Sequence, residues 1–191
     1  MRIVVTNPDA MGDAVLRLPM LQAIAREGHP LLVICRPLAE YLLRRGLAGT
    51  DARIAVVPES PYEMARAGRS DFNREVLTRI HEFQPDTLVF GPYQWTILED
   101  WLSRELPGLA RIRMNGYRFE GRSVGPLPAG DETIVPVDEH WHETAKSERL
   151  CAQILGHDVK LGDPSLQADD HDKSRAREHI PSAPGGTEWL K

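Results

Sequence analysis

The chain has 191 residues, with 23 lysines and arginines against 28 aspartates and glutamates, for a formal net charge of −5. Sequence-independent binding of nucleic acid needs a basic surface, so this balance argues against it. No apolar stretch approaches the ~20 residues of a membrane-spanning helix, and no signal-peptide pattern opens the chain. We therefore expect a cytoplasmic protein without a transmembrane segment. Its two cysteines, Cys35 and Cys151, are expected to be buried free thiols.

Short apolar runs alternate with helical patterns over most of the chain. Five runs rich in apolar residues predict buried strands, the last of them weaker: 2–6, 31–35, 53–57, 87–90 and 110–114. Apolar residues at helical spacing predict helices between these strands: 12–27, 37–46, 72–83 and 97–106. Pro19 predicts either a kink in the first helix or a short turn followed by a helix that restarts at this proline.

The remaining segments are more polar. Residues 59–70 read as a loop and 116–137 as irregular chain. Asp138 is expected to cap a helix that ends at Leu155, with Gly156 in the left-handed conformation just after it. A short exposed helix is expected over 169–179. We interpret 1–137 as one domain, 138–164 as a helical linker and 165–191 as a polar tail.

The strands are apolar throughout rather than alternating, which indicates a parallel sheet covered by helices on both faces. Right-handed crossovers make such an α/β sheet doubly wound. Ligands of these folds bind at the carboxyl ends of the strands. The loops where chemistry is expected therefore begin at Asn7, Arg36, Pro58, Gly91 and Asn115.

The turn after the first strand carries the most specific pattern. It reads Thr-Asn-Pro-Asp-Ala-Met-Gly-Asp over residues 6–13 and continues to Leu-Pro-Met-Leu at 18–21. A single glycine disfavours binding of NAD or FAD, whose fingerprint has three. Met-Gly-Asp followed by Leu-Pro-x-Leu resembles glycosyltransferase family 9, the ADP-heptose:lipopolysaccharide heptosyltransferases. Four further segments extend the resemblance: Pro85–Val89, Arg111–Arg113, a helix that His140 and Glu143 open and that ends at Gly156, and Pro184–Gly186 followed by Lys191.

The resemblance implies a GT-B architecture, of which this chain corresponds to the N-terminal, Rossmann-like, acceptor-binding half. Residues 165–191 then resemble the start of a donor domain. The implied reaction is inverting transfer of a sugar, as ADP-heptose, to a lipopolysaccharide-type acceptor, without a metal or other cofactor. The implied substrate partner is an anionic oligosaccharide or a lipid-linked sugar acceptor. The implied protein partner is a separate donor-domain chain or a second copy of this chain. Peripheral contact with the inner face of the membrane is also implied. Because transfer requires both substrates in a closed cleft, we expect weak activity or none from one half alone.

Asp13 is the expected catalytic base, both because a carboxylate at the crevice suits that role and because the resemblance implies it. The alternative is that Asp13 only stabilises the start of a helix. Gly12 is expected to adopt a positive φ or to allow a ligand close approach. Expected substrate contacts also include Asn7 and Met11 in the same turn.

Residues on the other loops complete the expected site. Three arginines, Arg66, Arg69 and Arg118, are expected to hold anionic groups of the acceptor, although solvated arginines are the commoner case. Gln94, beside Tyr93 and Trp95, suits a sugar, with core packing of Trp95 as the alternative. No metal site is expected: His140 and His142 point to different helix faces, and the Asp-His-Asp of 170–172 lies in the polar tail.

The sequence also departs from the family pattern. Asn7 stands where a basic residue is common, and Asp9-Ala10 where serine or threonine precedes Gly-Asp. A second hypothesis is therefore a non-catalytic sugar- or nucleotide-binding module. A third is self-association through a face that would otherwise meet the second domain.

Overall fold

A computed structural model describes residues 1–68, 72, 74–119, 130–164 and 166. Its strands form one six-stranded sheet, in which every neighbouring pair is parallel, in the order β3-β2-β1-β4-β5-β6. The predicted doubly wound α/β fold is confirmed. The strands are β1 (Ile3–Asn7), β2 (Leu31–Cys35), β3 (Arg53–Val56), β4 (Thr87–Phe90), β5 (Ala110–Met114) and β6 (Glu132–Val135).

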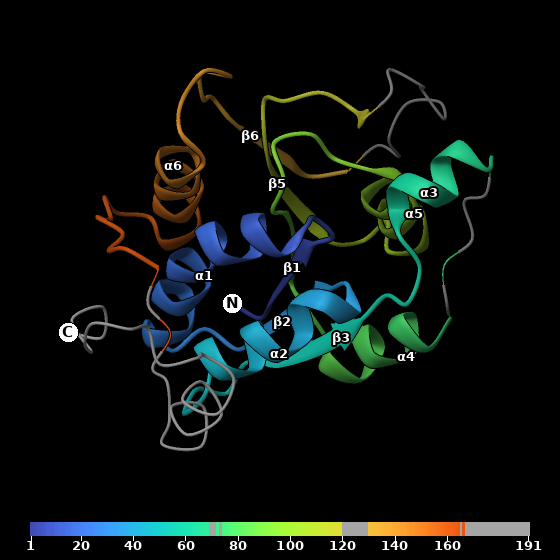
Figure 1. Cartoon of the computed structure of the whole chain (residues 1–191), viewed down its shortest axis with the longest axis horizontal. Coiled ribbons are helices and arrows are strands. Elements are labelled where there is room, and N and C mark those ends of the chain that lie inside the picture. The colour runs from blue at the N-terminus through green and yellow to red at the C-terminus, as the bar shows by residue number, and fades with distance from the viewer. Residues whose placement is uncertain (69–71, 73, 120–129, 165, 167–191) are drawn as a thin grey trace, which may run out of the picture.

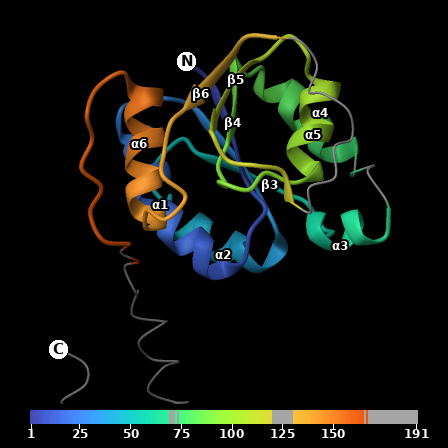
Figure 2. The same ribbon diagram turned by 90° about the horizontal axis from the view of Figure 1, so that it is seen from above.

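Helices cover both faces of the sheet (Figures 1 and 2). One face carries α1 (Met11–Arg26), α2 (Pro37–Gly46) and α6 (Glu143–Leu155). The other carries α3 (Pro61–Arg66), α4 (Arg74–Phe83) and α5 (Ile97–Glu105). Successive strand residues point to opposite faces, so Ile3 and Val5 of β1 belong to the first core and Val4 to the second. This is why the strands read as unbroken apolar runs.

Two elements lie where the sequence predicted irregular chain. The strand β6 lies at the sheet edge beside β5, and only Val135 among its four residues is buried. The helix α3 begins at Pro61, after Ser60, whose side chain accepts a hydrogen bond from the Glu63 N–H. Serine before proline is a helix-start signal, but a helix of six residues has no periodicity to support it.

The start of α6 also differs from the prediction. His142, rather than Asp138, caps the helix by accepting a hydrogen bond from the Thr144 N–H. Asp138 instead accepts a bond from the His140 N–H, at 2.8 Å, in the turn that precedes the helix. The predicted left-handed Gly156 is confirmed, with a φ of 77°.

The first helix is continuous, because α1 runs from Met11 to Arg26 through a buried Pro19. The alternative of a helix that restarts at this proline is therefore wrong. Cys35 and Cys151 are free and buried, as predicted, and burial raises the pKa of their thiols to about 12 and about 11. None of the helices in the described ranges is long and apolar enough to cross a bilayer. The helix expected over 169–179 lies outside the described residues.

Candidate functional site

The order of the strands reverses between β1 and β4, so the crevice of this fold lies at the carboxyl ends of these two strands. Their close approach requires a glycine. A Cβ atom on Gly91 would collide with the carbonyl oxygen of Thr6, and the Gly91 N–H donates to the Thr6 hydroxyl at 3.3 Å. The sequence thus brings the first βα turn directly against the loop that follows β4.

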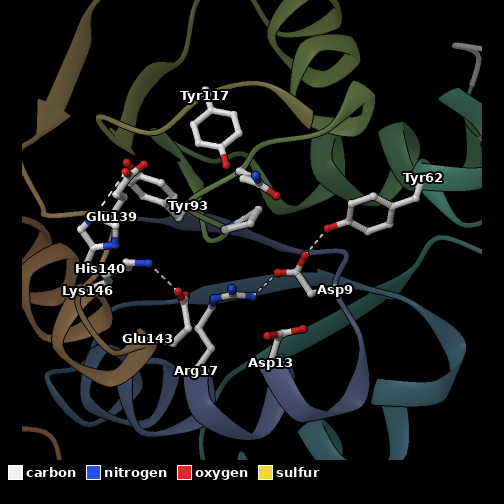
Figure 3. Close-up of a pocket in the computed structure, with 12 residues that line it drawn as sticks. Asp9, Asp13, Arg17, Tyr62, Tyr93, Tyr117, Glu139, His140, Glu143 and Lys146 are labelled. Carbon is white, nitrogen blue, oxygen red and sulfur yellow. Dashed lines mark hydrogen bonds and ion pairs between the residues drawn. The ribbon is translucent and has the colours of Figure 1, made fainter. Parts of the chain in front are cut away.

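A pocket of about 410 Å³ opens at this point (Figure 3). Its walls come from the β1–α1 turn, α1, α3, the loops after β4 and β5, the chain that enters α6, and the first turn of α6. The lining residues are Asp9, Asp13, Arg17, Tyr62, Pro92, Tyr93, Gln94, Tyr117, Glu139, His140, Glu143 and Lys146. Charged groups and phenols therefore dominate the pocket.

Asp13 lies in the first turn of α1, where the nearby backbone N–H of Ala10 favours its ionised form. In the described part of the chain, no cationic side chain forms an ion pair with it. Burial raises the pKa of Asp13, and the charge of Asp9 raises it further, while Arg17 opposes the shift and Glu143 adds to it. A carboxylate with a raised pKa is a stronger base than a solvated one.

The turn between β1 and α1 is held by hydrogen bonds among the side chains of Asn7, Asp9, Arg17 and Tyr62. Asp9 accepts from Arg17 Nη1 at 2.8 Å and from the hydroxyl of Tyr62. Arg17 also donates to the side-chain oxygen of Asn7. Burial and then the charge of Asp9 raise the pKa of Tyr62. These contacts fix the guanidinium of Arg17 in the wall of the pocket.

The start of α6 supplies the opposite wall. Lys146 Nζ lies 2.7 Å from Glu143 Oε1 and 4.5 Å from the ring centroid of Tyr93. Glu139 lies against His140 in the preceding turn, with Oε1 and Nε2 3.5 Å apart. Glu143 and Lys146 were not predicted as site residues, because a pair three residues apart on a helix is the ordinary pattern of a solvated face.

Of the residues predicted from the first turn, Asp13 lines the pocket. Asn7 does not, because its side chain is fully buried and holds Arg17, so the expectation of a direct substrate contact is corrected to a supporting role. Met11 and Gly12 are exposed at the start of α1, outside the lining. Gly12 has no positive φ, so that reason for the glycine is wrong, and a Cβ placed there would meet no protein atom within 4 Å. Close approach of a ligand to Gly12 stays a prediction.

Gln94 lines the pocket as expected, whereas Trp95 packs on Phe90. Two of the three arginines expected to hold an anion, Arg66 and Arg118, lie elsewhere. Arg66 is exposed at the end of α3, and Arg118 is buried with its Nε 2.5 Å from Asp100 Oδ2. Neither lines the pocket, and Arg69 lies outside the described residues.

The described residues contain no group of three His, Cys, Asp or Glu side chains placed to hold a metal ion. The Asp-His-Asp sequence of 170–172 and the terminal Lys191 lie outside these ranges.

A parallel sheet of this order, with a polar pocket at its switch point, defines an α/β Rossmann-like domain of the kind that forms half of a GT-B glycosyltransferase. No protein-family model matches the chain, and no curated protein matches it by sequence. Solved structures do match. A glycosyltransferase family 9 protein from Veillonella parvula superposes with a TM-score of 0.64 at 17 % identity, over 93 % of this chain and 47 % of that one.

Two Escherichia coli enzymes show the same likeness. Heptosyltransferase WaaC, solved with ADP, matches at 14 % identity and a TM-score of 0.58, over 94 % of this chain and 54 % of the enzyme. ADP-heptose lps heptosyltransferase II matches at 18 % identity and a TM-score of 0.56, over 95 % of this chain and 52 % of the enzyme. The chain thus spans about half the length of these structures. At these identities the match shows a shared fold, and at that level the resemblance to family 9 is confirmed.

Proposed function

We propose that this chain forms the acceptor-binding half of an inverting glycosyltransferase, with Asp13 as the general base. One observation carries the proposal: a carboxylate with a raised pKa, unpaired with any cation of the described residues, lies in the pocket at the switch point of the sheet. The shared fold of the heptosyltransferases supports the reaction class.

In the proposed reaction, Asp13 removes the proton from an acceptor hydroxyl as its oxygen attacks the anomeric carbon of a nucleotide-sugar. The bond from that carbon to the diphosphate breaks, and the nucleoside diphosphate leaves with the electron pair. Attack opposite the leaving group inverts the anomeric centre. Because transfer needs both substrates in one closed cleft, a second domain is required to hold the donor. The names of the similar structures make ADP-heptose the donor, and an uncharged oligosaccharide of the lipopolysaccharide type the acceptor, to test first.

The same pocket is unsuited to a nucleotide. Dinucleotide-binding folds place a pyrophosphate at the first helix N-terminus, among backbone N–H groups. Here the carboxylates of Asp9 and Asp13 occupy that turn. The two carboxylates would repel a diphosphate. The donor is therefore assigned to the other half.

The experiment is calorimetric titration of the 191-residue chain with ADP, ADP-heptose and the oligosaccharide, with product detection by mass spectrometry after long incubation. We expect the oligosaccharide to bind and ADP not to bind. Asp13→Asn should still bind the oligosaccharide but lower any transfer by about 100-fold or more, the loss typical of a missing general base. Asp51→Asn, at an exposed turn before β3, is the matched control.

Two results would overturn the proposal. Tight ADP binding without oligosaccharide binding would assign the chain to the donor side. Transfer that is unchanged in Asp13→Asn would show that Asp13 is not the general base.

A further inference from the structure

The cationic side chains of the pocket are already neutralised. The side chain of Arg17 is 5 % exposed and pairs with Asp9, and that of Lys146 is 6 % exposed and pairs with Glu143. Neither cation is therefore available as a strong new partner for an incoming anion. Burial of each pair also means that breaking it would leave an unpaired charge, which is costly.

The carboxylates, in contrast, include exposed groups. The side chain of Glu139 is 57 % exposed and that of Glu143 is 35 % exposed, and Asp13 forms no ion pair with a described residue. Four carboxylates against two cationic side chains line the pocket, which gives a formal charge of −2 with His140 neutral. A ligand therefore enters a negative field.

Aromatic rings stand beside these carboxylates. The rings of Tyr93 and Tyr117 meet edge to face with centroids 5.9 Å apart, and both line the pocket (Figure 3). One of them already holds an ammonium group, since Lys146 lies over the ring of Tyr93. Tyrosine faces with nearby carboxylates favour cationic ligands, and such rings also stack against sugars.

We propose that this pocket takes an acceptor that carries an ammonium group beside its hydroxyls, an amino sugar or aminopolyol, and discriminates against anionic sugars. This inference rests on the proposed function, because it assigns the acceptor to the same pocket. The volume of about 410 Å³ suits a small saccharide.

The test compares three probes of matched size: the methyl glycosides of glucosamine, glucose and glucuronic acid. Each is titrated into the whole chain by calorimetry, at a pH where the amine is protonated and the acid ionised. We expect the glucosaminide to bind about tenfold tighter than the glucoside, with the glucuronide weakest. Added salt should reduce the difference, because the preference is electrostatic.

A charge variant locates the effect. Glu139→Gln removes one exposed carboxylate of the pocket, so the preference for the glucosaminide over the glucoside should fall by about two- to fivefold, the effect of one exposed charge. Glu82→Gln removes an equivalent charge from the exposed side of α4, on the opposite face of the sheet, and should change nothing.

Equal binding of the three glycosides, or tightest binding of the glucuronide, would overturn the inference while leaving Asp13 as the base. Tightest binding of the glucuronide would instead support the anionic acceptor that the family resemblance implies. Binding of ADP with no binding of any glycoside would be a failure of the proposed function itself.

Discussion

At the scale of single residues, the chemistry of Asp13 depends on two neighbours of opposite charge. Asp9 precedes it by four residues and Arg17 follows it by four, and these two are paired with each other at 2.8 Å. Asp9 has the larger effect of the two, so together with burial the surroundings raise the pKa of Asp13. The departure from the family pattern at Asp9 thus strengthens the base.

Asp9→Asn should lower the pKa of Asp13. The substitution removes a negative charge and leaves the charge of Arg17 uncompensated, and both effects favour the ionised carboxylate. The measurement is a pH titration of the Asp13 carboxyl carbon by NMR. Tyr62→Phe, which removes a hydrogen bond to Asp9 but no charge, is the control and should cause a much smaller shift. An unchanged or higher pKa in Asp9→Asn would contradict this account.

The sequence predicted some site residues correctly for a simple reason. Asp13 and Gln94 come directly after strands whose carboxyl ends meet, so chain order alone places them near the crevice. Arg66 and Arg118 also follow strands, yet one is exposed at the end of α3 and the other pairs with Asp100. The direction of a long side chain, and its choice of ion-pair partner, depend on tertiary contacts that spacing does not encode.

At the scale of elements, α5 begins with a buried capping box. Glu99 Oε2 accepts hydrogen bonds from the N–H and the hydroxyl of Thr96, each at 2.6 Å, and its side chain is fully buried. Burial raises the pKa of Glu99 to about 7, although hydrogen bonds from Thr6 and Thr96 oppose the shift. The Thr-x-x-Glu spacing of this capping box can be recognised in the sequence, whereas the burial of the Glu99 side chain cannot.

Glu99 should make the protein less stable as the pH rises from 4.5 toward 7. In this window the unfolded chain releases the proton while the folded state retains it, so the free energy of unfolding falls, by on the order of 3 kcal/mol across the window. Glu99→Gln should remove this part of the slope. Urea unfolding at several pH values measures it, with Glu82→Gln as the control. A variant that keeps the full slope would contradict the assignment to Glu99.

The long apolar strands were predicted within a few residues, because burial on both faces leaves an unbroken apolar run. The edge strand β6 and the short α3 were missed. The burial of β6 on one side only gives it a mixed composition, and α3 is too short for a periodic stripe. Prediction therefore failed for elements that depend on contact with a neighbouring element and have no periodic apolar pattern in their own sequence.

At the scale of the whole molecule, α6 joins the folding core to the pocket. The sequence predicted a linker helix over 138–164, and the structure packs α6 against α1 on one face of the sheet (Figure 2). Leu150, Cys151 and Ile154 lie in the same buried cluster as β1 and α1. On the same face of this helix, its first turn carries Glu143 and Lys146 into the pocket. The site therefore depends on this helix being docked.

Leu150→Ala should destabilise the entire described domain rather than α6 alone. Leu150 is fully buried, and replacing a buried leucine with alanine costs about 2–5 kcal/mol. Because the Leu150 side chain shares a core with β1 and α1, the variant should still unfold in one transition, with its midpoint at a lower urea concentration. Circular dichroism and tryptophan fluorescence should give the same midpoint. Leu38→Ala, at an exposed position of α2, is the control and should cost about 0.5 kcal/mol or less.

An early loss of helical signal in Leu150→Ala, with the fluorescence transition unmoved, would show that α6 melts separately, as a linker would. The same measurement bears on the pocket. If α6 is part of the core, conditions that unfold half of the Leu150→Ala molecules should also halve glycoside binding, because Glu143 and Lys146 leave the wall with the helix. Folding and acceptor binding would then share one equilibrium, and the helix expected to connect domains would be part of the site.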